Sequence, residues 1–156
     1  CISITMELEK LSSDIQTIDI NNNAILLASL NAKNFHCSKI KFIHQNFFYF
    51  KPTQKYDLII SNPPYIALDE MDDLDQEVLL YDPLNALTDY DDGLNFYKYF
   101  FEFGINNLNK NGYMLFEFGG QHQVNSLKNI FNNQYYSYNF FDDLNGDTRF
   151  ILIQKM

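Results

Sequence analysis

The sequence predicts an α/β fold built on a twisted, mostly parallel β-sheet with an antiparallel hairpin at its end. The prediction rests on the alternation of short β-rich segments with segments of helical periodicity, and on two strand-like segments that flank a turn sequence near the C-terminus. Strands that alternate with helices form parallel sheets because each crossover helix returns the chain to the same end of the sheet.

Apolar spacing defines the first five elements. Residues 1–11 and 22–35 carry apolar side chains at helical spacing and predict two helices. Residues 16–20 and 40–44 alternate in the manner of strands. The apolar run at residues 56–61 predicts a buried strand, because it is continuous rather than alternating.

The later elements continue the alternation and add the final hairpin. In chain order they are a strongly amphipathic helix at residues 94–108, a turn at 109–112, a strand at 113–118, a helix at 121–131, and strands at 135–141 and 149–154. Gly119 and Gly120 end the strand before them. Asn145-Gly146-Asp147 supplies the turn residues between the last two strands.

Composition limits the classes of function. The chain has 156 residues, 46% of them hydrophobic and 17% aromatic, which suits one domain with one core and excludes a disordered chain. The net charge of −9 disfavours a nucleic-acid partner, because proteins that bind phosphate backbones usually carry a basic patch.

The sequence also limits the compartment. No apolar run is long enough to span a bilayer, and the opening residues lack the basic region of a signal peptide. Cys1 and Cys37 suggest neither a disulfide scaffold nor a metal site. We therefore expect a protein of a reducing compartment, the cytoplasm or an organelle matrix, without a membrane or a metal ion.

The most informative motif is Asn62-Pro63-Pro64-Tyr65. Neither proline can donate to a sheet ladder, so the preceding strand ends at Asn62, and the carboxyl ends of strands are where open α/β sheets bind ligands. The Asn62 side-chain oxygen and the Pro63 carbonyl can accept both N–H groups of a planar –NH2, and the Tyr65 ring can cover an amide or a base. The same residues also suit an ordinary turn after a strand.

Further segments extend this motif into a pattern over essentially the whole chain. They are the strand-end acid in Thr17-Ile18-Asp19-Ile20, the core at residues 59–66, and the blocks at residues 81–87, 92–97, 112–121 and 143–149. Their order resembles the class I, S-adenosylmethionine-dependent methyltransferases and, more narrowly, the release factor glutamine methyltransferases. Many amino-methyltransferases share the four-residue motif, whereas the downstream blocks in this order are far more specific.

The resemblance implies a Rossmann-like fold, S-adenosylmethionine as cofactor, and roles for individual residues. Asp19 would accept the ribose hydroxyls, Asn46 would contact the adenine amine, and Phe47 would stack on adenine. Asn62 would lie beside the cofactor and, with Pro63, Pro64 and Tyr65, would hold the substrate amide. Asp19 also suits a turn or N-cap acid, and Phe47 suits a core aromatic. Where this chain has Asn46 the family usually has Asp, a stronger acceptor.

The resemblance also bears on how much of the protein the chain contains. We expect residues 1–156 to form the methyltransferase catalytic domain without its N-terminal part, because the family carries its first strand and glycine-rich turn just before the position of Cys1. Loss of that central strand would leave the strands at residues 16–20 and 56–61 with one sheet neighbour fewer each. We expect the missing part to be needed for activity.

Other polar residues have less specific interpretations. Glu117 ends a strand at the same edge, which suits substrate orientation or a buried, paired acid. Arg149 is expected to pair with Asp143 or Asp147, and the three histidines do not cluster and suit structural or solvent-facing roles. Gly119-Gly120-Gln121 spells the tripeptide at the tip of release factors, but its place between a strand and a helix makes this a coincidence.

The predicted reaction is transfer of a methyl group from S-adenosylmethionine to the side-chain amide nitrogen of the glutamine in the GGQ motif of a peptide chain release factor. Positioning would supply most of the rate, and no residue is a convincing general base. The protein is expected to act as a monomer on this partner. The alternatives are a nucleic-acid amino-methyltransferase that holds a flipped base, and a non-catalytic remnant of the fold.

Overall fold

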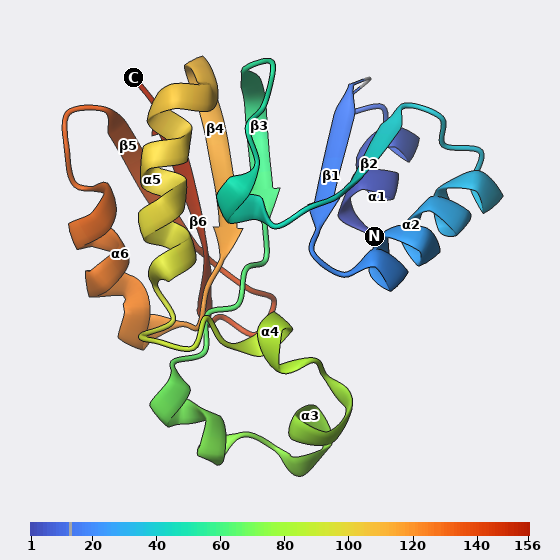
Figure 1. Ribbon diagram of the computed structural model, residues 1–156. Coiled ribbons are helices and arrows are strands. Elements are labelled where there is room, and N and C mark those ends of the chain that lie inside the picture. The colour runs from blue at the N-terminus through green and yellow to red at the C-terminus, as the bar shows by residue number, and fades with distance from the viewer. Residues whose placement is uncertain (13) are drawn as a thin grey trace. The chain divides into compact units, whose positions relative to one another are not determined.

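The computed structural model describes residues 1–12 and 14–156, which divide into two compact units, Cys1–Lys51 and Pro52–Met156. We call these the N-terminal unit and the C-terminal unit, and Figure 1 shows the elements of each. Among the described residues, no helix has the length and apolar character needed to cross a membrane.

The N-terminal unit is a two-stranded parallel sheet with its helices. Its elements are α1 (Ile2–Leu8), β1 (Ile15–Asp19), α2 (Asn22–Asn34), β2 (Ile40–His44) and the 3₁₀ turn η1 (Phe47–Tyr49). β1 and β2 pair in parallel from Ile15 opposite Ile40 to Asp19 opposite His44, so their carboxyl ends lie at one edge. The Asn21 side chain caps α2 by accepting backbone N–H groups of its first turn.

The C-terminal unit is a four-stranded sheet in the order β3-β4-β6-β5. Its elements are β3 (Tyr56–Ser61), η2 (Leu68–Asp73), α3 (Gln76–Tyr81), α4 (Leu84–Leu87), α5 (Asn95–Asn107), β4 (Leu108–Glu117), η3 (Gln121–Gln123), α6 (Val124–Phe131), β5 (Tyr136–Asp142) and β6 (Thr148–Lys155). β3 and β4 are parallel, whereas β6 pairs antiparallel with both β4 and β5. The predicted α/β fold with a final antiparallel hairpin is confirmed.

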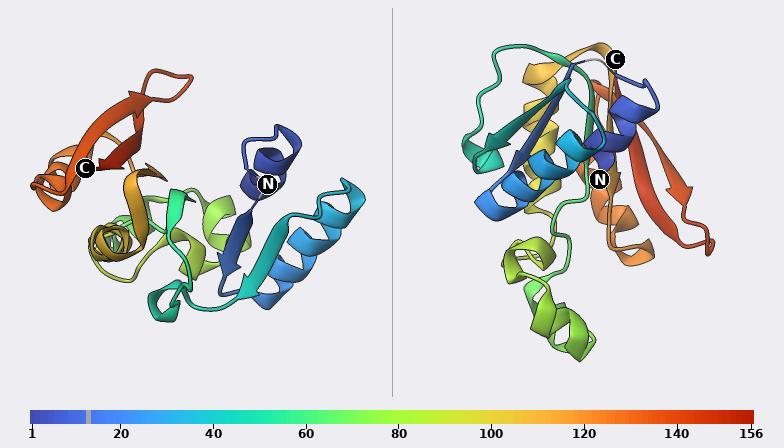
Figure 2. Two further views of the ribbon diagram at one scale, coloured as in Figure 1. Left: turned by 90° about the horizontal axis from the view of Figure 1, so that it is seen from above. Right: turned by 90° about the vertical axis from the view of Figure 1, so that its right-hand side faces the viewer.

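The core of the C-terminal unit lies on one face of this sheet. Met114 and Phe116 of β4, and Ile151 and Ile153 of β6, are fully buried and alternate with more exposed residues, as period-2 strands require. Helices α5 and α6 cover this face (Figures 1 and 2). The Phe116 ring stacks on Phe100 of α5 with 4.2 Å between centroids.

Residues 56–61 form a strand as predicted, but the expectation that this strand is buried is wrong. None of the residues of β3 is buried, and Leu58 is 40% accessible. β3 lies at the edge of its sheet, where its one paired neighbour among the described strands is β4, and β1 likewise pairs with β2 alone. Because β3 pairs on one side only, its apolar side chains remain partly accessible.

The prediction of a turn at residues 109–112 is also wrong, because these residues belong to β4. Tyr56 pairs with Leu108 and Leu58 with Tyr113, so β4 passes through a wide irregularity between the two pairs. Asn111 has φ 63° within it, a left-handed conformation that asparagine tolerates better than most residues. The turn-forming residues therefore make a bulge within a strand instead of ending one.

Candidate functional site

The Asn-Pro-Pro-Tyr motif lies at the carboxyl edge of the sheet in the C-terminal unit. β3 and β4 run in parallel with Ser61 opposite Phe116, so the motif begins beside the end of β4 at Glu117. Asn62 is exposed, Pro63 is buried, and Tyr65 is half-buried. The arrangement leaves the amide of the motif accessible while its proline anchors the turn.

Tyr65 contacts Glu117 across this edge. Its Oη donates a hydrogen bond to Glu117 Oε1 at 3.4 Å. Burial raises the pKa of Tyr65, and the negative charge of Glu117 raises it further, against an opposing effect of Arg149. Tyr65 is therefore a neutral hydroxyl at physiological pH. The fully buried Tyr97 donates its own Oη to the Glu117 backbone oxygen at 2.7 Å and fixes the end of β4.

Gln123 also joins the motif to the end of β4. This residue is almost fully buried, at 5% accessible. Nε2 donates to the Tyr65 backbone oxygen at 2.7 Å, and Oε1 accepts the Gly119 N–H at 2.8 Å. One side chain therefore satisfies a backbone acceptor of the motif and a backbone donor just after β4.

Gly93 packs directly against the Tyr65 backbone carbonyl. It has φ +72°, and a Cβ at this position would lie 2.2 Å from the Tyr65 oxygen, far inside van der Waals contact. No other residue fits without displacing the motif.

Asp89 shapes the loop that carries Gly93. Its Oδ1 accepts backbone N–H groups from Asp91 at 2.9 Å and Gly93 at 3.0 Å, and its Oδ2 accepts that of Asn95 at 2.8 Å. These charge-assisted bonds hold the start of α5 in place. The Asp89 carboxylate thereby fixes the position of Gly93 against Tyr65.

Arg149 connects the final hairpin to this edge. Its Nη1 donates to the Gly119 oxygen at 3.0 Å, and its Nε lies 4.0 Å from Asp143 Oδ2. The expected pairing with Asp143 is confirmed. The Gly119-Gly120-Gln121 tripeptide joins β4 to η3, which agrees with its interpretation as a strand-to-helix junction.

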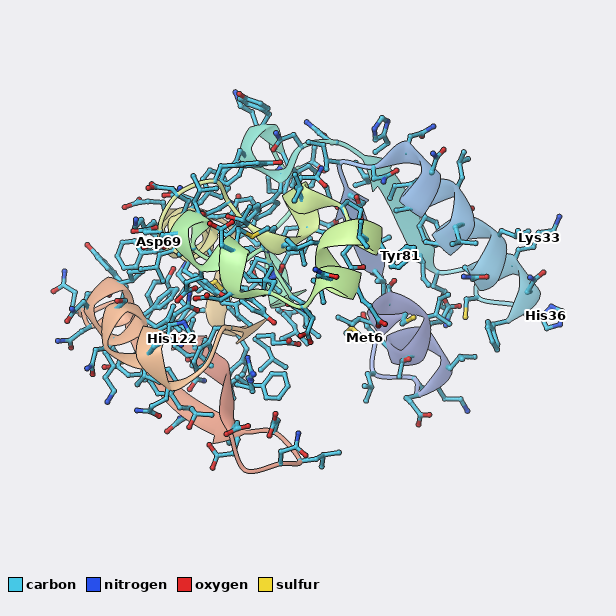
Figure 3. All side chains as sticks on the ribbon, turned by 90° about the horizontal axis from the view of Figure 1, so that it is seen from below. Met6, Lys33, His36, Asp69, Tyr81 and His122 are labelled. Carbon is cyan, nitrogen blue, oxygen red and sulfur yellow. The ribbon has the colours of Figure 1, made fainter. Side chains whose placement is uncertain are left out.

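The histidines do not form a site. His44 Nε2 lies 3.0 Å from the Ile20 oxygen, and His122 Nε2 lies 3.6 Å from Glu70 Oε1 with its side chain largely exposed. His36 follows α2 in the N-terminal unit, whereas His122 belongs to the C-terminal unit (Figure 3). In the described part of the chain, no three His, Cys, Asp or Glu side chains are grouped in a way that could hold a metal ion.

The N-terminal unit gathers the residues predicted to bind the cofactor at its own carboxyl edge. Asp19 ends β1, is exposed, and accepts the Asn21 N–H at 2.7 Å through Oδ1. Asn46 lies two residues after β2, where its Oδ1 accepts the Phe48 N–H at 2.9 Å, and the half-buried Phe47 opens η1. The N-cap of α2 is Asn21 and not Asp19, which leaves Asp19 in the turn before it.

Sequence reasoning did not single out Gln123, Gly93, Asp89 or Tyr97. One signal for Gln123 is its spacing: it lies four residues before the buried Leu127, on the face of the helix that packs against the sheet. Nothing comparable in the sequence marks the contact of Gly93 with Tyr65, because it joins loops far apart in the chain.

Parallel strands that end in an antiparallel hairpin, with an Asn-Pro-Pro-Tyr motif at the carboxyl edge, are typical of the class I methyltransferases. The family model for the Eco57I restriction-modification methylase matches residues 2–118. The chain therefore belongs to this methylase family.

Two curated relatives refine the resemblance. The release factor glutamine methyltransferase of Fusobacterium nucleatum is 39% identical over 155 residues, which cover 99% of this chain and 44% of that protein. The enzyme of the same name from Bacillus subtilis is 41% identical over 103 residues, 65% of this chain and 35% of that protein. The resemblance to release factor glutamine methyltransferases is confirmed, and the chain spans less than half the length of either relative.

A solved structure of low sequence identity supports the fold. The N-methyltransferase NodS from Bradyrhizobium japonicum, in complex with S-adenosyl-l-homocysteine, superposes with a TM-score of 0.60 at 12% identity. The match covers 97% of this chain and 71% of NodS.

Proposed function

We propose that the complete natural protein containing this chain transfers a methyl group from S-adenosylmethionine to the side-chain amide nitrogen of a release factor glutamine. The observation that carries the proposal is the Asn62–Tyr65 motif at the carboxyl edge of β3, held beside Glu117 in a chain with relatives of that name. We assign residues 1–156 to the catalytic domain of this protein and propose that it acts as a monomer.

The motif would act by positioning the amide. The exposed Asn62 side-chain oxygen and the Pro63 carbonyl can each accept one N–H of the –NH2 group, which fixes the plane of the amide. An amide nitrogen is a poor nucleophile, so alignment with an electrophile contributes most of the gain in rate. When bound, S-adenosylmethionine supplies that electrophile as a sulfonium methyl group.

Residues of the N-terminal unit would hold the nucleoside part of the cofactor. The Asp19 carboxylate is exposed, and it retains lone pairs for ribose hydroxyls beyond the one N–H that it accepts. Asn46 and Phe47 lie at the same edge and would contact the adenine amine and ring. The complex of the structural neighbour NodS with S-adenosyl-l-homocysteine supports this cofactor class.

The second candidate is a nucleic-acid amino-methyltransferase, which the name of the matching family favours. Two observations weigh against it. Residues 66–92, which follow the motif, include ten of the 20 acidic residues and no Lys or Arg, and would repel a phosphate backbone. Asp69 and Tyr81 of this segment are exposed (Figure 3). The F. nucleatum relative also matches 99% of the chain, beyond the family model's limit at residue 118.

The test measures methyl transfer by the complete natural protein with labelled S-adenosylmethionine. The acceptors are a release factor, the same factor with its GGQ glutamine changed to alanine, duplex DNA and RNA. We expect label in the first acceptor alone. An Asn62→Ala variant should lose about 100-fold in kcat, whereas Asn145→Ala, in the exposed hairpin turn, should be unchanged. Label in DNA or RNA but in neither factor would replace the proposal with the second candidate.

A further inference from the structure

We propose that Gln123 is a positioning residue for the Asn-Pro-Pro-Tyr motif, an inference that rests on the proposed function. Gln123 does not belong to the motif and lies 58 residues after Tyr65 in the chain. Its side chain connects the motif to the end of β4 and thereby sets where Asn62 and the Pro63 carbonyl present their acceptors.

The geometry needs a side chain that both donates and accepts. Nε2 donates to the Tyr65 oxygen at 2.7 Å, and Oε1 accepts the Gly119 N–H at 2.8 Å. A primary amide provides both functions at this length. Because Gln123 is only 5% accessible, losing either bond leaves a buried polar group without a partner.

The Tyr65 carbonyl has little freedom to move. Gln123 holds it by a hydrogen bond, and the Cα of Gly93 lies so close that a Cβ there would be 2.2 Å from the same oxygen. The backbone between Tyr65 and Asn62 contains two prolines, whose rings fix φ near −65°. A displacement of the Tyr65 carbonyl is therefore transmitted to the Pro63 carbonyl and Asn62 instead of being absorbed between them.

The isosteric variant Gln123→Glu separates this role from general packing. An ionised Glu keeps the acceptor for Gly119 but places a negative oxygen against the Tyr65 carbonyl in place of a donor. A protonated Glu has an O–H that can donate to that carbonyl and restores the native pattern. Burial favours the protonated form, so the variant should recover as the pH falls.

The experiment uses the complete natural protein and compares Gln123→Glu and Gln123→Met with Gln121→Glu. Gln121 is the matched control, because it lies in the same 3₁₀ turn and is exposed. The readouts are kcat and KM for the release factor from pH 6 to 8.5, cofactor affinity, and hydrogen exchange of the Gly119 amide.

We expect Gln123→Glu at pH 8 and Gln123→Met at any pH to lose about 10- to 100-fold in kcat, with KM and cofactor affinity changed less than about threefold. The kcat of Gln123→Glu relative to the parent should rise as the pH falls, and Gln121→Glu should match the parent throughout. Parent-like kcat in Gln123→Met, or a loss in Gln123→Glu that is the same at every pH, would overturn the inference.

Hydrogen exchange separates this inference from the proposed function. Gln123→Met should exchange the Gly119 amide at least about tenfold faster, while amides of the β5–β6 hairpin keep their parent rates. If the parent protein methylates no release factor, the proposed function fails, and faster Gly119 exchange still establishes the structural link. Unchanged Gly119 exchange in Gln123→Met refutes the link whatever the activity.

Discussion

The two units of the chain differ in how much apolar surface they bury. Among the described residues, the buried apolar side chains of the N-terminal unit are Ile4, Ile15, Ala32 and Phe50. Those of the C-terminal unit number fourteen: Met71, Tyr97, Phe100, Phe103, Leu108, Met114, Phe116, Phe118, Val124, Leu127, Phe131, Tyr136, Ile151 and Ile153. In the N-terminal unit, Leu26, Leu27, Leu30 and Phe35 remain more than half exposed. The C-terminal unit therefore has the core that a stable domain needs, and the N-terminal unit has only the beginning of one.

The same difference separates the two sets of candidate site residues. Asp19 and Asn46 bond to backbone N–H groups two residues away. Tyr65 bonds to partners 52 and 58 residues away. Local turns are thus sufficient to orient the proposed ribose contact, whereas the proposed amide contact requires the complete tertiary structure of its unit. Substitutions in the two units should therefore have different consequences.

The largest effect is expected from Phe116→Ala in the core of the C-terminal unit. The fully buried Phe116 ring packs against Tyr97 and Phe100 of α5, and its removal should lower the free energy of unfolding by about 3–5 kcal/mol. Phe35→Ala is the control in the N-terminal unit, where the side chain is 58% exposed and the loss should be below about 0.5 kcal/mol. Denaturant unfolding of both variants measures the difference, and equal losses would contradict the comparison of the two cores.

Gly93→Ala should have the next largest effect. The added Cβ must displace the Tyr65 carbonyl, so both stability and methyl transfer should fall, with a loss of about 2 kcal/mol or more in unfolding free energy. Gly146→Ala, at φ +88° with no neighbour within 4 Å of the added Cβ, carries the backbone strain alone and should cost about 1 kcal/mol.

The pair separates strain from collision. Thermal unfolding gives the stability of each variant, and kcat on the release factor reports the motif. If Gly146→Ala proves as damaging as Gly93→Ala, the positive φ rather than the contact with Tyr65 explains why glycine occupies position 93.

How far the sequence predicts the structure follows the same division between local and long-range contacts. β2, β3 and the β5–β6 hairpin were placed almost to the residue, because apolar alternation and the turn at Asn145-Gly146-Asp147 act over a few positions. The exposure of β3 was not predicted, because burial depends on whether a second neighbour pairs with the strand. Gln123 is not predicted for the same reason, since its hydrogen bond to Tyr65 joins residues 58 positions apart and exists only in the folded unit.

A third prediction compares one residue type in the two units. Asp89→Ala removes an acceptor of three backbone N–H groups and should cost about 1–2 kcal/mol of stability. Asp19→Ala removes an exposed acceptor of one N–H and should cost under about 1 kcal/mol, yet it should weaken S-adenosylmethionine binding at least about tenfold through loss of the proposed ribose contact. Calorimetry measures the cofactor affinity of each variant, and denaturant unfolding measures its stability. Cofactor affinity that is lost in Asp89→Ala and kept in Asp19→Ala would reverse the assignment.

The smallest effect is expected at Lys98 and Asp92, at the start of α5. Their side chains approach to 2.6 Å but are 48% and 46% exposed, so water screens the pair and Lys98→Ala should cost only about 0.2–0.5 kcal/mol at neutral pH.

Partial burial by itself raises the pKa of Asp92, but the hydrogen bonds from Lys98 and the Leu94 N–H outweigh it, and the net pKa lies below the usual carboxyl value. A lowered pKa in the folded state means that the stabilisation is complete above the carboxyl pKa of the unfolded chain and is lost as the pH falls through the folded value. The difference in unfolding free energy between parent and Lys98→Ala should therefore vanish once the pH falls below the lowered pKa of Asp92, and in about 1 M salt. A difference that persists in acid would mean that the Lys98 methylene chain stabilises α5 by packing. Apolar contact, and not charge, would then account for the stabilisation at this surface position of the C-terminal unit.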